Sequence, residues 1–282
     1  MTVSSYFLPA SVPEALGLLG EHGPELLVIA GGTVAMPLIN EGISLPGRVM
    51  GLRRAGLDRV ERAGAELRVG ATATLTQLVG QGDVPLLAEA ASRTASWSVR
   101  NMATVGGNLF TPPPGGDVAT ALLALDARVV VAGPAGERTL PLTAFWTGFM
   151  TTALASDELV TSIIVPLDEG RTAFLKFGRR RANTPAVVTV AAHATLEHDR
   201  VVSIRLALGA AAPHPVRLTR AEAVVAGSSL EPAVIDEAAA LAAEDADPVA
   251  DAVASDWYRR RMTGVFVRRI LEQLAGRAGR DA

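Results

Sequence analysis

The chain has 282 residues, of which 49% are hydrophobic and 20% are charged, and its formal net charge is −3. This length is enough for two or three domains with buried cores, and the composition excludes an intrinsically disordered chain. The nearly balanced charge argues against a nucleic-acid partner, which would need a concentrated basic surface. Cysteine is absent, which excludes disulfides, a cysteine nucleophile and thiolate ligands for an iron–sulfur cluster. Any redox chemistry therefore depends on a bound organic cofactor.

Membrane insertion and export are not expected. The longest uncharged run, residues 139–156, contains five threonines, a proline and a glycine, so it is too polar and too broken to span a bilayer. The N-terminus has no basic segment before an apolar stretch, so no signal peptide is expected. We therefore expect a cytoplasmic protein.

The first predicted elements form a compact unit. Ser11 and Glu14 have the spacing of a helix N-terminus, and Gly23 is expected to end that helix. The apolar run at residues 26–30 predicts a strand buried on both faces, and a second apolar run follows at residues 48–52. A short helical segment between the two runs completes a βαβ-like unit.

The rest of the chain predicts an α+β fold. Short alternating segments (66–69, 127–131 and 159–165) predict strands, and they are interleaved with helical stretches near 74–80, 84–95 and 117–125. Beyond Asp168-Glu169-Gly170, paired strands are expected at 186–196 and 201–209, followed by helices at 231–244 and 255–275. We therefore divide the chain into residues 1–57, 58–168 and 171–282.

Two glycine pairs are candidates for an anion site. They lie in Ala30-Gly31-Gly32-Thr33, directly after the first predicted strand, and in Thr104-Val105-Gly106-Gly107-Asn108. Adjacent glycines allow backbone N–H groups to approach a phosphate closely, although an isolated pair is more often an ordinary tight turn. Neither segment matches the dinucleotide pattern G-x-G-x-x-G or the P-loop.

The remaining polar candidates have ordinary explanations. Asp117 is expected either to cap the helix that it begins or to bind a ribose or purine amino group. The four histidines have no metal-ligand spacing, and no serine lies in a nucleophile-elbow motif. The arginine runs 179–181 and 259–261 are expected to be solvated faces or ion pairs. We therefore predict no metal site and no catalytic acid or base.

Taken in order, a set of short motifs resembles the FAD-binding medium subunit of the molybdenum hydroxylases, the family of xanthine dehydrogenase and carbon monoxide dehydrogenase. The resemblance extends from about residue 4 to residue 276. The two glycine segments carry it together with Val69-Gly70-Ala71, Val99-Arg100-Asn101, Asp117, Asp157-Glu158-Leu159-Val160, Pro166, Lys176, Arg179, Arg180, Tyr258-Arg259-Arg260 and Val267-Arg268-Arg269.

The resemblance implies a two-subdomain FAD-binding domain of the PCMH-like type, followed by a C-terminal antiparallel sheet with helices. It implies that FAD lies extended between the subdomains with its pyrophosphate on the two glycine segments, Asp117 toward the adenosine end, and Leu159 or Val160 behind the isoalloxazine. The implied cofactor-binding residues are Val28, Ile29, Ala30, Gly31, Gly32, Thr33, Val34, Ala35, Thr104, Gly106, Gly107, Asn108, Thr111, Asp117, Leu159, Val160 and Lys176.

Lys176 is implied to approach the polar edge of the isoalloxazine. It is the single lysine among 26 basic residues. In a chain that uses arginine elsewhere, this retained lysine indicates that a compact ammonium group is needed at that position.

The resemblance also implies partners and a role. A large subunit with molybdopterin and a small subunit with two [2Fe–2S] clusters would complete a heterotrimer, which is expected to dimerise, and this chain would pass electrons from the clusters to an acceptor. The chain departs from the family at Val34-Ala35-Met36-Pro37 and at Pro112 to Pro114, which leaves the acceptor open. Two alternatives remain at this point, a stand-alone flavin oxidase or reductase and a non-catalytic assembly protein with the same fold.

Overall fold

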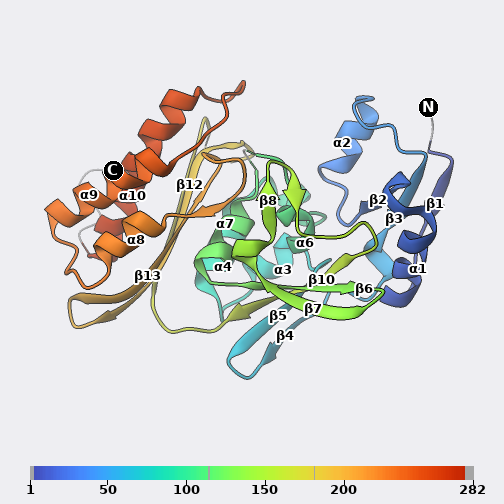
Figure 1. Cartoon of the computed structure of the whole chain (residues 1–282), viewed down its shortest axis with the longest axis horizontal. Coiled ribbons are helices and arrows are strands. Elements are labelled where there is room, and N and C mark those ends of the chain that lie inside the picture. The colour runs from blue at the N-terminus through green and yellow to red at the C-terminus, as the bar shows by residue number, and fades with distance from the viewer. Residues whose placement is uncertain (1–2, 114, 181, 277–282) are drawn as a thin grey trace.

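The structure, a computed structural model, describes residues 3–113, 115–180 and 182–276. Three parts follow one another along the chain, each built on its own sheet with helices, and they lie side by side in Figure 1. The N-terminal part is blue and the C-terminal part runs from yellow to red, on either side of the middle part. The predicted α+β class with a C-terminal antiparallel sheet is confirmed.

The N-terminal part has a three-stranded parallel sheet in the order β1–β3–β2. Its elements are β1 (Ser5–Phe7), α1 (Val12–His22), β2 (Leu26–Ile29), α2 (Ala35–Asn40) and β3 (Arg48–Gly51). Ser11 caps α1 and Gly23 ends it with a φ of 52°, as the sequence predicted. The predicted βαβ unit is confirmed, but β2 is an edge strand and only Leu26 and Ile29 are buried. These two residues lie on opposite faces of the strand, so each face has one buried residue, as the sequence predicted, and Leu27 and Val28 are half-buried.

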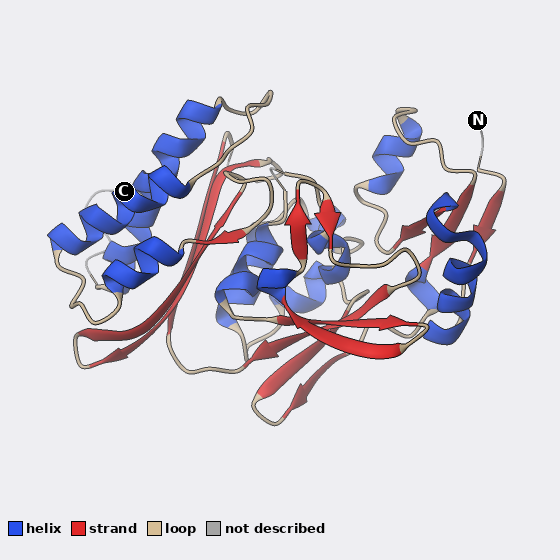
Figure 2. Ribbon diagram, in the orientation of Figure 1, coloured by secondary structure: helices blue, strands red, loops and turns tan. Residues whose placement is uncertain are grey.

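The middle part has a five-stranded antiparallel sheet in the order β4–β5–β10–β6–β7, and Figure 2 shows helices gathered against it. The strands are β4 (Val60–Ala63), β5 (Glu66–Gly70), β6 (Arg128–Gly133), β7 (Gly136–Pro141) and β10 (Leu159–Pro166), and the small hairpin is β8 (Trp146–Gly148) with β9 (Thr151–Thr152). The helices are α3 (Leu75–Val79), α4 (Pro85–Arg93), α5 (Trp97–Arg100), α6 (Val105–Leu109) and α7 (Asp117–Ala124). Helix α7 is buried along its whole length, so its first residue is held rigidly in the core.

The C-terminal part is a four-stranded antiparallel sheet covered by three helices. Its elements are β11 (Arg171–Gly178), β12 (Ala186–Glu197), β13 (Arg200–Gly209), β14 (Val216–Arg217), α8 (Thr219–Val225), α9 (Pro232–Asp245) and α10 (Asp256–Leu274). Figure 1 shows the helices on one face of β12 and β13, and α7 of the middle part packs on these two strands as well. The strands and long helices predicted for this region are confirmed.

Polar contacts join the middle and C-terminal parts near the segment that connects β10 to β11. Arg205 on β13 donates to the Ala124 carbonyl (3.0 Å), to the Asp168 carboxylate (2.9 Å) and toward Nδ1 of buried His193 (3.1 Å). The division at 1–57, 58–168 and 171–282 remains our proposal for the domain boundaries.

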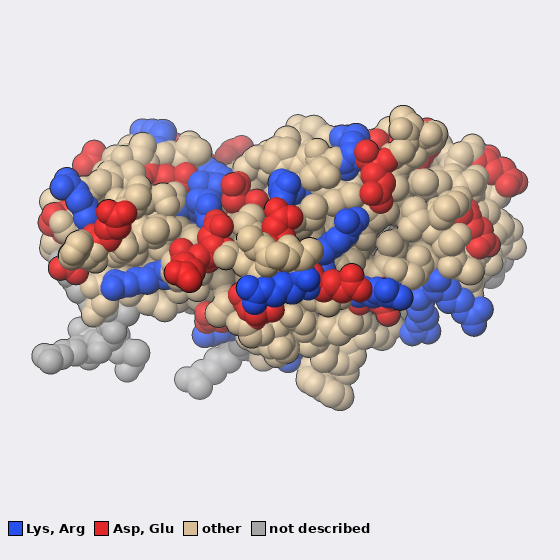
Figure 3. Space-filling view, turned by 90° about the horizontal axis from the view of Figure 1, so that it is seen from below, with Lys and Arg blue, Asp and Glu red and all other residues tan. Residues whose placement is uncertain are grey.

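The surface carries no concentrated basic stripe on the face shown in Figure 3, where acidic and basic side chains are interspersed. Among the described residues, no helix is long and apolar enough to cross a membrane.

Candidate functional site

The first glycine segment forms an open loop between β2 and α2. Gly32 has a φ of +69°, in the left-handed region that favours glycine. In the described part of the chain, no hydrogen bond uses the backbone N–H groups of Gly32, Thr33 or Val34 as donors. Gly32 and Thr33 are half-buried and Val34 is exposed. Successive unused N–H groups of this kind form a nest that binds an anion such as a phosphate.

The first glycine segment packs against the turn that leads into the second one. A Cβ on Gly31 would overlap the backbone carbonyl of Met102, and it would lie 3.0 Å from the Cα of Ala103. Only glycine allows this close approach, so Gly31 fixes the first loop against the turn that leads into the second segment.

In the second glycine segment, the backbone N–H groups of both glycines already donate to acceptors within this chain. The N–H of Gly106 donates to the Ala71 carbonyl (2.9 Å), and that of Gly107 donates to the Thr104 hydroxyl (3.1 Å), which caps α6. A Cβ on Gly106 would lie 2.6 Å from the Ala71 oxygen. Packing against Ala71 therefore explains Gly106, and the pyrophosphate role of Gly106 and Gly107 stays a prediction.

Asn108 and Thr111 are held in the same region by specific contacts. The side-chain oxygen of Asn108 accepts the N–H of Ala119 (2.9 Å), and the Thr111 hydroxyl donates to the Gly107 carbonyl (3.3 Å). The first bond ties α6 to the first turn of α7, which begins with Asp117, and the second ties the segment after α6 back to that helix.

Asp117 does not cap its helix. Gly116, with a φ of +87°, is the N-cap residue and Asp117 is the first helical residue, so the capping interpretation was wrong. One carboxylate oxygen of Asp117 accepts from the Lys176 ammonium (2.6 Å), and the other accepts from the Thr189 hydroxyl (2.8 Å). The Lys176 and Asp117 side chains are only 9% and 7% exposed. The single lysine of the chain is thus half of a buried ion pair between the middle and C-terminal parts.

This ion pair corrects one detail of the expected cofactor pose. Asp117 was expected at the adenosine end and Lys176 at the isoalloxazine, yet their charged groups are in contact. They cannot lie at opposite ends of an extended dinucleotide, so one of the two placements is wrong. Lys176 also donates to the Arg93 carbonyl (3.3 Å). An ammonium has three donors, so one remains for a ligand beyond the two acceptors found in the described residues.

The other predicted cofactor-binding residues are buried or half-buried. Leu159 is buried in the core of the N-terminal part, and Val160 is buried in the core of the middle part. The first loop is flanked by half-buried Val28, buried Ile29 and half-buried Ala30 and Ala35. The structure thus brings together the first loop with Met102, and the Asn108 segment with Asp117, Lys176 and Thr189.

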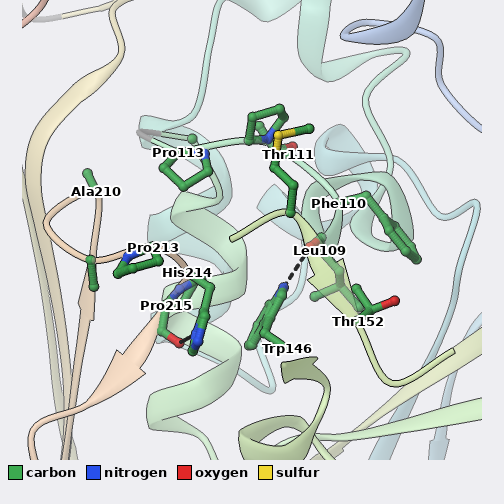
Figure 4. A pocket seen from close by; sticks show the side chains of 14 residues that line it. Leu109, Phe110, Thr111, Pro113, Trp146, Thr152, Ala210, Pro213, His214 and Pro215 are labelled. Atoms are coloured by element: carbon green, nitrogen blue, oxygen red, sulfur yellow. Dashed lines mark hydrogen bonds between the residues drawn. The ribbon is translucent and has the colours of Figure 1, made fainter. Parts of the chain in front are cut away.

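A small apolar cavity of about 70 Å³ lies beside this region rather than in it (Figure 4). The Trp146 ring stacks on His214 with centroids 6.0 Å apart, and its N–H donates to the Leu109 carbonyl (2.9 Å). Thr111 is the one predicted site residue that lines it. Sites for drug-sized ligands and cofactors are several times larger, so this cavity is not the site of a dinucleotide.

Two predictions concern metals and arginines. Within residues 3–113, 115–180 and 182–276, no group of three His, Cys, Asp or Glu side chains is placed to hold a metal ion. Arg259 is fully buried and donates to three backbone carbonyls and to Asp251. Of the two expectations for this run, the ion pair is therefore confirmed for Arg259 and the solvated face is not. Arg181 and Pro114 lie outside the described residues.

Sequence reasoning missed Thr189 and Met102. Thr189 lies opposite Lys176 in the register of β11 and β12, a pairing that no local motif indicates. Met102 matters through its backbone carbonyl, so its side-chain type carries no signal.

Comparison with known proteins places this geometry in a class of flavoproteins. Residues 2–168 match the model for the FAD binding domain in molybdopterin dehydrogenase, and residues 173–274 match that for the CO dehydrogenase flavoprotein C-terminal domain. The carbon monoxide dehydrogenase medium chain of Hydrogenophaga pseudoflava is 30% identical over 273 residues, covering 94% of this chain and 95% of that protein. The xanthine dehydrogenase FAD-binding subunit of Escherichia coli O157:H7 is 28% identical and covers 98% of this chain and 97% of its own length.

The solved structures agree. A chain of the Hydrogenophaga pseudoflava carbon monoxide dehydrogenase superposes with a TM-score of 0.94 at 30% identity, and each chain covers 99% of the other. A chain of quinoline 2-oxidoreductase from Pseudomonas putida 86 gives a TM-score of 0.90 at 27% identity, again with 99% of each chain covered. The chain belongs to the FAD-binding medium subunits of the molybdenum hydroxylases. It is an oxidoreductase subunit that binds FAD, in a family whose molybdopterin and iron–sulfur cofactors lie on partner chains.

Proposed function

We propose that this chain accepts electrons from the [2Fe–2S] clusters of a small partner subunit and passes them through FAD to an acceptor. A large subunit with molybdopterin would oxidise the substrate of the complex. Because the chain has no cysteine, it cannot hold the clusters itself, and electrons have to arrive from another polypeptide. We further propose a cytoplasmic complex that is a dimer of heterotrimers.

The residues present fit FAD. The unused N–H groups of Gly32, Thr33 and Val34 suit the negative charge of a pyrophosphate, and the spare donor of Lys176 suits a polar edge of the cofactor. FAD supplies the redox chemistry when bound. The chain's own residues bind and orient it, and the Asp117–Lys176 pair sets the local electrostatic field.

The open nest at Gly32 carries the proposal and offers its test. Gly32→Val would place a β-branched side chain at a φ of +69°, which is strained and would reorient the nest. We expect the purified variant to contain little FAD, whereas the wild type contains one non-covalent FAD per chain. Gly64→Val is the matched control, because Gly64 has a φ of +63° and open space around it, in the turn between β4 and β5. Full FAD occupancy in a folded Gly32→Val variant would contradict the assignment of the first loop as the pyrophosphate site.

A weakly charged surface beside the site is our proposed docking face for the iron–sulfur subunit. Residues 30–46, 96–115 and 145–155 contain only two charged residues, Glu41 and Arg100, although 20% of the chain is charged. They contribute many exposed apolar side chains: Val34, Met36, Ile43, Leu45, Trp97, Met102, Phe110, Phe149 and Met150. Stable interfaces are depleted in charge and enriched in aromatic residues and methionine. Helix α2 and the β8–β9 hairpin, which belong to these segments, both lie on the upper side of the molecule in Figure 1.

The docking face can be tested without disturbing the flavin. Met150→Glu introduces a charge at a side chain that is 64% exposed, and we expect it to weaken the complex with the iron–sulfur subunit at least tenfold while FAD is retained. Trp257→Glu, on α10 and 63% exposed, is the control and should leave complex formation unchanged. Equal affinity for Met150→Glu and the wild type would remove the β8–β9 hairpin from the interface.

A further inference from the structure

Two side chains of the C-terminal sheet donate hydrogen bonds to Asp117, one to each carboxylate oxygen. Lys176 on β11 and Thr189 on β12 are direct partners in the antiparallel register, so their side chains share one face of the sheet. The ammonium reaches one oxygen of Asp117 at 2.6 Å and the hydroxyl reaches the other at 2.8 Å. These two hydrogen bonds therefore connect the β11–β12 pair to the first residue of α7.

Asp117, Lys176 and Thr189 are all shielded from water. Thr189 is 1% exposed and Asp117 is 5% exposed. A buried carboxylate needs both of its oxygens satisfied, and hydrogen bonds to a charged group are among the stronger ones in proteins. Lys176 alone would leave one oxygen of Asp117 with an unsatisfied lone-pair direction and the carboxylate free to rotate. The Thr189 hydroxyl removes that freedom.

We propose that Thr189 is a positioning residue for the flavin site: its hydroxyl fixes the Asp117 carboxylate, and through it aims the Lys176 ammonium at the cofactor. This inference rests on the proposed function, because it assumes that the spare donor of Lys176 faces FAD. The hydroxyl also adds the positive end of its dipole beside Asp117. Its removal makes the local field more negative, which opposes the addition of electrons to the flavin.

Thr189→Val tests the role, since valine has nearly the same shape, favours strands and lacks the hydroxyl. We expect the variant to fold, to bind FAD about tenfold more weakly, and to hold it at a lower reduction potential than the wild type. Thr189→Ser keeps the hydroxyl and should restore both properties. Thr195→Val, on the same strand but opposite Ser203, is the control for loss of a threonine hydroxyl and should change neither.

The outcomes separate this inference from the proposed function. If wild-type chain binds FAD and Thr189→Val has the wild-type potential and affinity, the positioning role is wrong even if the variant unfolds at a lower denaturant concentration. If Thr189→Ser behaves like Thr189→Val, the hydroxyl is not the active group and the inference also fails. If the wild-type chain binds no FAD, the proposed function itself is overturned and the inference with it.

Discussion

Lys176→Met should show that the buried ion pair couples the middle and C-terminal parts. Methionine keeps the length of the side chain but removes the charge, so Asp117 is left buried with only the Thr189 hydroxyl as a side-chain donor among the described residues. Removing one partner of a buried, hydrogen-bonded pair costs about 3–5 kcal/mol. The side chains of Lys176 and Asp117 are 9% and 7% exposed, so solvent screens this loss little, and we expect an effect in that range.

The assay is denaturant unfolding of the FAD-free chain, followed by circular dichroism, for the wild type, Lys176→Met, Asp117→Asn and the double variant. Asparagine retains an oxygen for Thr189 but carries no charge. If the ion pair is formed, the double variant loses less free energy of unfolding than the two single variants together, by about 0.5–3 kcal/mol. Additive losses would contradict the ion pair, because they would mean that the two side chains do not interact in solution.

In the holo-protein, Lys176→Met leaves a negative charge beside the cofactor and should lower the two-electron reduction potential of bound FAD by roughly 30–60 mV, which spectroelectrochemical titration measures; an unchanged potential would move Lys176 away from the flavin. Burial and the neighbouring charge of Arg205 lower the pKa of His193 below its ordinary value of 6.5, so the unfolded chain binds a proton that the folded chain resists. The free energy of unfolding should therefore fall as the pH drops below about 6.5, and His193→Gln should flatten that dependence in unfolding curves taken across this range. Arg259→Met leaves three carbonyls and Asp251 without their buried donor and should cost about 3–5 kcal/mol, whereas the exposed neighbour Arg260→Ala should change the unfolding midpoint little; comparable losses would place Arg259 in solvent.

Local patterns in the sequence were enough to predict the elements that surround the site. The β2 strand, the glycine loop after it and the helix that starts at Asp117 each have a signal within about ten residues, and all three lie where they were expected. The edge position of β2 was not predicted, because an apolar run does not show where a strand lies in its sheet. That property depends on the strand order of the sheet.

The contacts that organise the site come from residues far apart in the chain. Thr189 reaches Asp117 only because β12 pairs with β11 and α7 packs on the sheet, and no spacing in the sequence encodes that arrangement. The burial of Arg259 was not predicted for a different reason. It lies seven residues before Phe266 and eleven before Ile270, on the buried stripe of α10, so helical periodicity could have identified it as buried.

The electron-transfer role is tested most directly by the absorbance of the bound flavin when this chain is mixed with its electron donor. The purified chain, loaded with FAD, is mixed anaerobically with the iron–sulfur subunit whose clusters have been reduced beforehand, and the flavin absorbance is followed. We expect the flavin to bleach as the clusters are reoxidised, and to stay oxidised when the chain is mixed with small organic substrates alone. A flavin that stays oxidised beside the reduced partner, or that turns over a substrate without any partner, would contradict the role of an electron-transfer subunit.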